Sequence, residues 1–367
     1  MKQKPLFTVD GETLTTTLLP PVRFVVEDFL PQGLHLLAGA SKIGKSWLAL
    51  WLCLQVAKGE KVWNFPSRSG DVLYLCLEDN YSRIQSRLLD IADTAPGNLH
   101  FATASEKLRC GLEQQIQQFL AGHPHTVLVV IDTLQRVRGA GGDTNAYAND
   151  YRDLEALKAL ADGNHLAILL IHHLRKREDE DPMNMISGTM GISGATDSNF
   201  VLRKDKRSSQ TATLYCTGRD IAYRELKLSF DSQAHRWLLL DDGAQEEPVP
   251  TDPLVVQLAE FLCAKGEFIG TATELSQALE PFTGETILPN VLMKRLIRHR
   301  NQVEEQGVHL ETSRTREARR IRLSLCCDES DGNDGKSSTA SVSDFLSQPS
   351  QLSQEKSENE APVKNAR

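Results

Sequence analysis

The sequence predicts an α/β fold with a mostly parallel central sheet over residues 31–242. Four near-continuous apolar runs, at residues 34–38, 72–77, 126–131 and 167–171, have the composition of strands that are covered on both faces. Longer helical stretches separate these runs, as expected of parallel strands joined by crossover helices. A glycine-rich segment that connects the first run to a helix is the third observation in favour of this fold.

The remaining segments extend this organisation. Apolar runs at residues 211–215, 225–230 and 236–240 are expected to add antiparallel strands to the sheet. Composition divides the 367 residues into five parts. They are an N-terminal arm (1–30), the α/β core (31–242), a linker (243–253), a second domain (254–327) and a tail (328–367). The tail is rich in Ser, Gln, Asp and Glu, and it is expected to be disordered because it has few large apolar residues.

The second domain has a recognisable order of elements. Helices are expected at residues 254–265, 273–279 and 288–300. Two short apolar segments follow, around residues 308–310 and 321–325, and an arginine-rich turn separates them. Three helices followed by a small hairpin form the layout of a winged helix, so we expect a small C-terminal winged-helix domain.

Charge is unevenly distributed along the chain. The formal net charge of −8 argues against a uniformly basic nucleic-acid-binding protein. Residues 290–325 nevertheless hold nine basic and four acidic side chains, whereas residues 328–367 hold four basic and eight acidic ones. Basic groups on the third helix and the hairpin would make binding to duplex or forked DNA strongly salt-dependent. A solvated, protein-facing winged helix is the alternative. The basic residues are Lys294, Arg295, Arg298, Arg300, Arg314, Arg316, Arg319, Arg320 and Arg322.

The glycine-rich segment fits the phosphate-loop pattern Gly-x4-Gly-Lys-Ser/Thr. Its glycines allow successive backbone N–H groups to face phosphates, Lys45 would reach the β and γ oxygens, and the Ser46 hydroxyl would bind Mg²⁺. The N-terminus of the following helix adds a favourable dipole. The segment predicts binding of ATP and Mg²⁺ through Gly39, Ala40, Ser41, Lys42, Ile43, Gly44, Lys45 and Ser46.

Two later strands are expected to end in carboxylates at the same sheet edge. The run at residues 126–131 ends in Asp132, which would bind the metal next to Ser46. The run at residues 72–77 ends in Glu78 and Asp79, and we favour Glu78 as the catalytic base. A solvated acid at the end of a strand is the alternative for Glu78.

A pair of histidines follows the fourth apolar run. His172 or His173 would sense the γ-phosphate, because the run places both at the edge of the sheet where ligands collect. A structural role is the alternative for either residue.

These residues resemble the RepA-like replicative helicases of plasmids and phages, within the RecA/DnaB superfamily of AAA-type hexameric ATPases. The resemblance covers roughly residues 15–242. It rests on the phosphate loop, on Leu75-Cys-Leu-Glu78-Asp79 with Arg83 and Arg87, on Val130-Ile-Asp132-Thr, on Ile171-His-His-Leu-Arg-Lys176, on Gly188-Thr-Met-Gly-Ile-Ser-Gly194-Ala-Thr-Asp197 and on Gly218-Arg219-Asp220. It implies a RecA-like P-loop core, with Glu78 as the catalytic glutamate.

The resemblance also implies an assembly and a substrate. Arg219 would be an arginine finger in the neighbouring subunit's site, although a salt bridge with Asp220 within its own hairpin is the alternative. The segment after the histidines would face a central channel that holds single-stranded DNA. The residues available for that contact are Arg175, Lys176, Arg177, Ser187, Thr189 and Ser193. The alternative for them is a mobile, solvated loop. A homo-oligomeric ring, most simply a hexamer, follows from these roles.

Three functions are compatible with this sequence. The first is a helicase-type motor in the replication of a mobile element, which acts on single-stranded or forked DNA. The second is a DNA-bound ATPase switch or loader that regulates replication proteins without unwinding. The third is a KaiC- or RadA-like ATPase without a role in replication, which the basic C-terminal domain disfavours.

The expected location is the cytoplasm. The longest apolar runs fall far short of the ~18 residues that a membrane span requires, and seven cysteines without metal-ligand spacing are consistent with reduced thiols. A short apolar patch at residues 342–346 in the tail is a candidate docking site for a replication protein.

Overall fold

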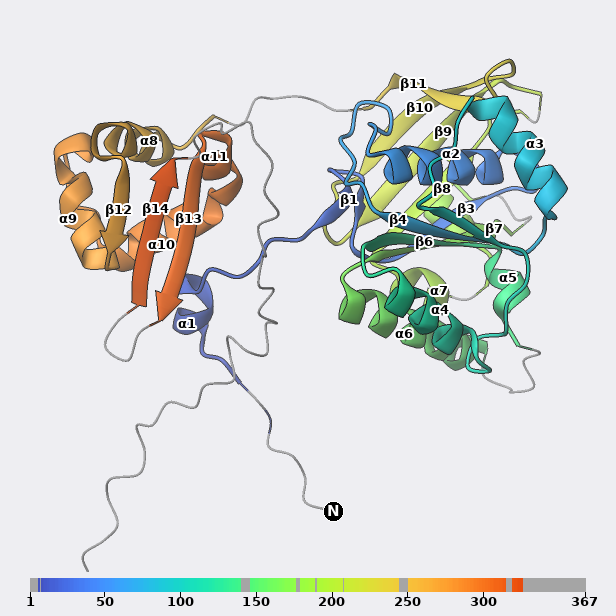
Figure 1. Cartoon of the computed structure of the whole chain (residues 1–367), viewed down its shortest axis with the longest axis horizontal. Helices are drawn as coiled ribbons and strands as arrows, with labels where there is room; N and C mark the ends of the chain where they lie inside the picture. Colours follow the sequence, from blue (N-terminus) through green and yellow to red (C-terminus); the bar gives the residue numbers. More distant parts are fainter. Residues whose placement is uncertain are drawn as a thin grey trace, which may run out of the picture. The chain divides into compact units, whose positions relative to one another are not determined.

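The computed structural model describes residues 6, 8–139, 146–175, 179–188, 190–206, 208–243, 250–314 and 319–325. The chain divides into two compact units, residues 21–246 and residues 1–20 together with 247–367 (Figure 1). The predictions for Lys176, Arg177, Thr189, Arg316 and the tail at 328–367 lie outside the described residues.

The larger unit is built on a central sheet. Its described strands have the order β11-β10-β9-β8-β3-β7-β6-β4-β5. The six strands from β8 to β5 in this order pair in parallel, whereas β9, β10 and β11 are antiparallel. The predicted α/β fold with a mostly parallel sheet is therefore confirmed. The strands are β3 (Gly33–Gly39), β4 (Asp71–Cys76), β5 (Leu99–Ala102), β6 (Thr126–Asp132), β7 (Ala167–His173), β8 (Ser198–Arg203), β9 (Thr211–Gly218), β10 (Arg224–Asp231) and β11 (Arg236–Asp241).

Helices cover both faces of this sheet (Figure 1). On one face lie α2 (Lys45–Lys58) and α3 (Tyr81–Ile91), and on the other lie α4 (Leu112–Gly122), α6 (Ala146–Asn164) and α7 (Met190–Ala195). Strand side chains alternate between the two layers, as the pleat requires. This two-sided burial explains why the strands are almost uniformly apolar. The short helices α5 (Leu134–Val137) and η1 (Pro182–Met185) and the strand pair β1 (Phe24–Val26) and β2 (Leu30–Pro31) complete this unit.

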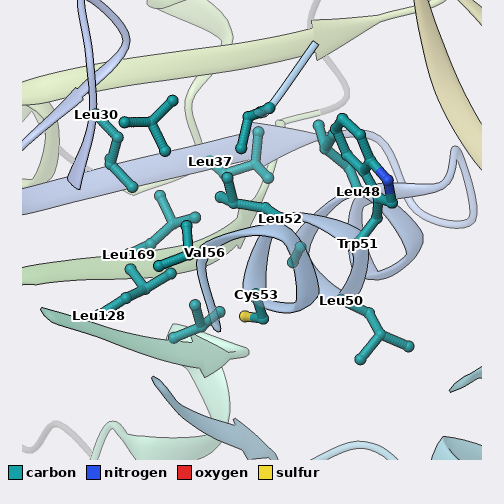
Figure 2. Close-up of a cluster of buried hydrophobic side chains, with 14 of the residues drawn as sticks. Leu30, Leu37, Leu48, Leu50, Trp51, Leu52, Cys53, Val56, Leu128 and Leu169 are labelled. Carbon is teal, nitrogen blue, oxygen red and sulfur yellow. The ribbon is translucent and has the colours of Figure 1, made fainter. Parts of the chain in front are cut away.

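Helix α2 is buried around most of its circumference. Leu48, Leu52 and Val56 pack towards Leu37, Leu128 and Leu169 of the sheet in the cluster that Figure 2 shows. Burial of each large apolar side chain stabilises the fold by about 1.5–3 kcal/mol. The helix that follows the phosphate loop is thereby held rigidly against the sheet.

The smaller unit contains helices and a three-stranded sheet. The sheet order is β12-β14-β13, and a separate apolar cluster joins the sheet to the helices. Thr271 and Glu274 form a capping box at the start of α9, and Pro289 occupies the first turn of α10. The elements are α8 (Pro253–Lys265), β12 (Glu267–Gly270), α9 (Ala272–Thr283), α10 (Pro289–Arg298), α11 (Arg300–Glu305), β13 (Val308–Arg314) and β14 (Arg319–Leu325). The third predicted helix is thus divided at His299, and strand β12 was not predicted.

The N-terminal segment belongs to this smaller unit. Helix α1 (Gly11–Thr16) is capped by Asp10, and Leu18 packs against the apolar cluster of the C-terminal domain. Arg319 donates hydrogen bonds to the Thr16 carbonyl (2.5 Å) and the Thr17 hydroxyl (2.9 Å). The arm expected to lead into the core as residues 1–30 is therefore divided near residue 20, because its first part is anchored to β14.

No helix among the described residues combines the length and the apolar character that crossing a membrane would require.

Candidate nucleotide-binding site

The predicted phosphate loop connects β3 to α2, and two of its glycines are sterically required. Gly44 has a φ of +103°, and a Cβ there would lie 3.1 Å from the Trp237 ring. A Cβ at Gly39 would lie 2.8 Å from Cδ1 of Ile43 and 3.0 Å from the Leu202 carbonyl oxygen. A side chain at either position would therefore force the loop out of shape.

Lys45 is buried beneath the loop. Its Nζ donates to the carbonyl oxygens of Gly39 (2.7 Å) and Ala40 (2.8 Å). Burial lowers the pKa of Lys45 to about 8, although the nearby Asp132 and Glu78 carboxylates act in the opposite direction. The ammonium group is therefore held in the centre of the loop and has lost much of its hydration.

This lowered pKa gives a testable pH dependence. Phosphate oxygens would favour the charged form of Lys45, so above pH 8 binding must be accompanied by proton uptake. We expect the dissociation constant for ATP to rise above pH 8, by up to about tenfold per pH unit, and to be flat below it. Titration with a fluorescent ATP analogue at constant Mg²⁺ measures this. Lys45→Arg is the control, because guanidinium keeps its charge over this range. An identical pH profile in both proteins would contradict the assignment.

Asp132 ends strand β6 close to Ser46. The Asp132 side chain accepts hydrogen bonds from Ser46 and from the Tyr74 hydroxyl, the latter at 2.9 Å. Burial raises the pKa of Asp132, and these two hydrogen bonds oppose the rise. Tyr74 was not identified from the sequence.

The Ser46 and Asp132 oxygens suit a magnesium ion. Magnesium prefers oxygen ligands and takes most of them from water and phosphates. The described residues contain no group of three or more His, Cys, Asp or Glu side chains that could hold a metal by themselves. The donor set therefore fits Mg²⁺ that is bound together with a nucleotide.

The two acids after β4 have different environments. Glu78 is exposed and accepts a hydrogen bond from the Thr133 hydroxyl at 3.1 Å. Asp79 forms ion pairs with Arg83 (2.7 Å) and Arg87 (2.5 Å) on α3. The Asp79 carboxylate is therefore occupied by cations, whereas Glu78 remains accessible beside Asp132.

The two histidines end strand β7, which lies between β3 and β6. His172 is buried, and its Nε2 is 2.9 Å from the Ser187 carbonyl oxygen. Burial lowers the pKa of His172, so its ring is neutral near pH 7. The Leu174 N–H donates to the Gly39 carbonyl at 3.3 Å. This strand end therefore connects the phosphate loop to the segment around Ser187.

That segment was expected to face DNA, and part of it is described. The Ser187 N–H donates to the His173 carbonyl, and Gly188 has a φ of +96°. The Ser193 carbonyl accepts hydrogen bonds from the side chains of Thr196 and Asn199. Arg175 lies 3.8 Å from Asp179. These contacts order the ends of the segment.

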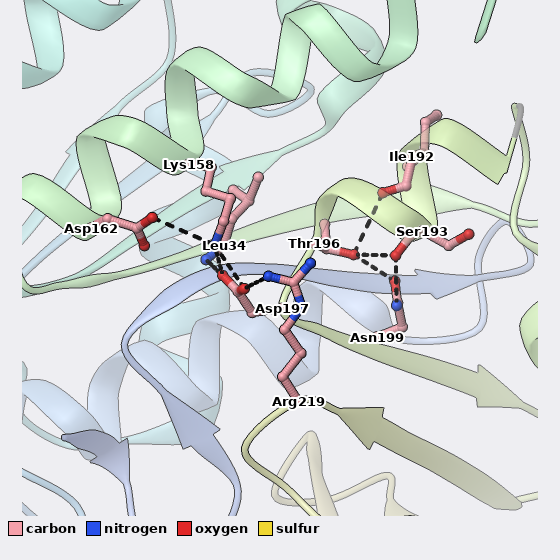
Figure 3. Close-up of polar contacts among 9 residues, drawn as sticks. All are labelled: Leu34, Lys158, Asp162, Ile192, Ser193, Thr196, Asp197, Asn199 and Arg219. Carbon is pink, nitrogen blue, oxygen red and sulfur yellow. Dashed lines mark hydrogen bonds and ion pairs between the residues drawn. The ribbon is translucent and has the colours of Figure 1, made fainter. Parts of the chain in front are cut away.

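Arg219 lies near the N-terminal ends of the parallel strands, whereas the phosphate loop lies at their C-terminal ends. It follows β9 and contacts Asp197, which precedes β8 near the start of β3 (Figure 3). The seven residues of β3 separate this end from the loop, a distance of about 20 Å. The carboxylate that pairs with Arg219 is that of Asp197, at 3.1 Å, and not that of Asp220, which was the alternative to the finger role. Arg219 therefore does not reach the phosphate loop of its own subunit.

An aromatic cluster that the sequence analysis missed supports the loop from outside. Trp47 stacks on His235 with ring centroids 4.8 Å apart, and the Arg87 guanidinium lies 5.4 Å from the Trp47 ring centroid. The indole of Trp237 donates to the Gly44 carbonyl at 3.2 Å. Trp47 directly follows Ser46, so the sequence shows an aromatic residue next to the loop. Its partners could not be identified because they are more than 35 residues away in the sequence.

In the smaller unit many of the predicted basic groups are already engaged. Arg295 pairs with Asp252 (2.5 Å), Arg300 with Glu304 (2.7 Å) and Arg322 with Glu267 (2.5 Å). Lys294 and Arg298 on α10 and Arg320 on β14 are exposed, with no ion-pair partner in the described part of the chain. The side chains of Arg314 and Arg316 lie outside the described residues.

The phosphate loop, the adjacent Ser46 and Asp132 oxygens, and the parallel strand order β4-β6-β7-β3-β8 define a P-loop nucleotide-binding core. Comparison with protein families agrees. Residues 3–179 match the AAA_25 family model, described as an AAA domain. The matched segment includes the phosphate loop, Glu78, Asp132 and both histidines.

Solved structures resemble about half of the chain. The chain is similar to a solved structure that is titled as the ATPase domain of another protein, with 15% identity, a TM-score of 0.48, and coverage of 57% of this chain and 85% of that one. It is also similar to "The Structure Of A DnaB-Like Replicative Helicase And Its Interactions With Primase", with 16% identity, a TM-score of 0.48, and coverage of 57% and 59% respectively. No curated protein matches the sequence.

Proposed function

We propose that this chain is an ATP-dependent DNA helicase-type motor that hydrolyses ATP with Mg²⁺ between the subunits of a ring. Its substrate is single-stranded DNA during replication of a mobile element, as its resemblance to the RepA-like helicases implies. The proposal is supported mainly by one observation, which is that the candidate catalytic residues lie in two groups at opposite ends of the parallel strands. Lys45, Ser46, Asp132 and Glu78 gather at one end, whereas Arg219 lies about 20 Å away at the other.

Each residue in the first group has a chemical task. Lys45 neutralises the β and γ oxygens of ATP, and Ser46 and Asp132 would hold Mg²⁺. The ion supplies charge neutralisation on the phosphates. Glu78 accepts a proton from the attacking water, and the hydrogen bond from Thr133 orients its carboxylate.

Arg219 would supply a second cation, in addition to Lys45, from the neighbouring subunit. In a head-to-tail ring each subunit presents one surface to the nucleotide site of the next. Arg219 would then stabilise the charge that develops on the γ-phosphate in the neighbouring site. Hydrolysis thereby depends on assembly, most simply as a hexamer.

His172 connects hydrolysis to DNA. It lies between the phosphate-loop strand and the Asp132 strand, and its ring contacts the Ser187 carbonyl. A change at the γ-phosphate would move this histidine, and the segment after Ser187 would move with it. His173, beside it, is the second candidate for this sensor.

The smaller unit would add DNA affinity as a winged helix. Its order of helix, strand, three helices and hairpin supports this assignment. Lys294 and Arg298 are one turn apart on α10 and exposed, so they can reach phosphates.

The Lys294→Glu/Arg298→Glu double variant is expected to weaken binding of the full chain to a forked duplex. The dependence of log K on log salt should become shallower by about two, because two phosphate contacts are lost. Arg322→Gln is the matched control, since Arg322 is exposed but paired with Glu267. Anisotropy titrations between roughly 50 and 200 mM salt measure both slopes. Unchanged slopes, or no binding by the unmodified chain at the lowest salt, would contradict this role.

Strand displacement distinguishes the motor from the alternative. ATP hydrolysis is measured with and without single-stranded DNA, and then displacement of one strand from a forked duplex is measured. The motor predicts stimulated hydrolysis and displacement, both abolished by Lys45→Ala. Stimulated hydrolysis without displacement would favour a DNA-bound switch or loader.

A further inference from the structure

The Asp197 carboxylate accepts hydrogen bonds from both charged and neutral donors at the end of the sheet where Arg219 lies (Figure 3). Lys158 Nζ lies 2.7 Å from Oδ1 and 2.6 Å from Oδ2 of Asp197. The Leu34 N–H donates to Oδ2 at 3.0 Å, and Nη1 of Arg219 donates to Oδ1 at 3.1 Å. One carboxylate therefore connects α6, the phosphate-loop strand β3 and the finger candidate.

The position of this carboxylate is fixed from several sides. The Asp197 N–H donates to the Leu34 carbonyl at 2.7 Å, and the Arg219 N–H donates to the Asp197 carbonyl at 2.9 Å. A Cβ on Gly33 would lie 2.5 Å from Oδ2, so only glycine leaves room for the carboxylate there. Asp197 is thus a rigid acceptor mounted on the first residues of β3.

The carboxylate is also held in its charged form. Burial raises the pKa of Asp197, but the hydrogen bonds from Lys158 and the Leu34 N–H outweigh that effect and leave the pKa below its usual range. A charged acceptor binds guanidinium more strongly than a neutral one does.

Within the described residues, the Arg219 guanidinium is bound to a side chain through one nitrogen atom, Nη1. Its side chain is 61% exposed, and Asp197 is the one side-chain acceptor that it has within the described residues. Guanidinium has five N–H donors. The other N–H groups therefore remain available for phosphate oxygens of another subunit.

We propose that Asp197 is a positioning residue that holds Arg219 in the orientation in which it enters the neighbouring subunit's nucleotide site. The inference rests on the proposed function of Arg219 as a finger in trans. Without the anchor, the long and exposed Arg219 side chain samples many rotamers, and few of them reach the γ-phosphate.

Asp197→Asn tests this role in the full chain. The expected result is unchanged ATP affinity and assembly, with kcat reduced about ten- to a hundredfold, because positioning affects the transition state rather than ground-state binding. Asp162→Asn is the matched control. It makes the same acid-to-amide change at another partner of Lys158, one that does not contact Arg219, and kcat should be unchanged. Thermal melting of both variants monitors folding.

Subunit mixing separates positioning from a purely structural role. Arg219→Ala subunits keep an intact phosphate loop, and Lys45→Ala subunits keep an intact finger. In an equal mixture about one interface in four combines the two intact parts, so activity should return. If Asp197 positions the finger, Lys45→Ala/Asp197→Asn subunits should restore at least tenfold less activity in the same mixture.

The outcomes are distinct. Equal rescue by Lys45→Ala and Lys45→Ala/Asp197→Asn subunits would overturn the positioning role while leaving the trans finger intact. No rescue by Lys45→Ala subunits, in mixtures shown to co-assemble, would overturn the trans finger and the positioning role with it.

Discussion

Replacing Glu78 by glutamine is expected to produce a protein that binds ATP with unchanged affinity and hydrolyses it about 10²- to 10⁴-fold more slowly. The amide cannot accept a proton from water, which removes general-base catalysis. Its oxygen can still accept the hydrogen bond that Thr133 donates to Glu78. The substitution therefore changes the chemistry and preserves the local geometry.

Single-turnover phosphate release and binding of a fluorescent ATP analogue measure the two properties of Glu78→Gln separately. Asp79→Asn is the matched control, because Asp79 is engaged by Arg83 and Arg87. It should destabilise α3 and leave the chemical step largely intact. Lys45→Ala should abolish nucleotide binding or turnover. Full turnover in Glu78→Gln with loss of turnover in Asp79→Asn would transfer the role of the base to Asp79.

Replacing Arg219 by alanine is expected to lower kcat about 10³- to 10⁵-fold without preventing assembly or ATP binding. The cation is exposed, and it contacts Asp197 rather than the phosphate loop of its own subunit. Its removal therefore costs little stability but deprives the neighbouring site of charge in the transition state.

Arg219→Lys measures how much of the loss in kcat is due to the charge alone. Lysine restores the charge as a single point and loses the fork of the guanidinium, so activity should fall between that of Arg219→Ala and that of the unmodified chain. Steady-state hydrolysis is measured on samples whose oligomeric state is verified by light scattering. Turnover by Arg219→Ala equal to that of the unmodified chain would remove Arg219 from the mechanism.

Much of the core fold can be predicted because its strands are buried on both faces. The four apolar runs correspond to β3, β4, β6 and β7, with ends within two residues of the observed ones. Two parallel strands were missed. Strand β5 has only four residues at the edge of the sheet, and β8 has only three consecutive apolar residues after a glycine-rich segment. Short or mixed strands lack the pattern on which the prediction depends.

Local motifs identified candidate site residues, but they could not give these residues their partners. The phosphate loop is a contiguous pattern, so its position between β3 and α2 followed from sequence. Lys158 and Asp197 are 39 residues apart, and Arg319 and Thr16 are 303 apart. Such contacts are determined by the tertiary fold. For the same reason the sequence did not show that residues 1–20 belong to the smaller unit, and several arginines that form ion pairs within that unit were expected to contact DNA.

In the proposed mechanism a neighbouring subunit completes the nucleotide site. The most direct test measures ATP hydrolysis per subunit as the protein is diluted through its assembly transition, with oligomeric state measured by mass photometry in the same buffer. Specific activity is expected to fall in parallel with the assembled fraction, while monomers still bind ATP. Constant specific activity down to concentrations at which only monomers are present would contradict it.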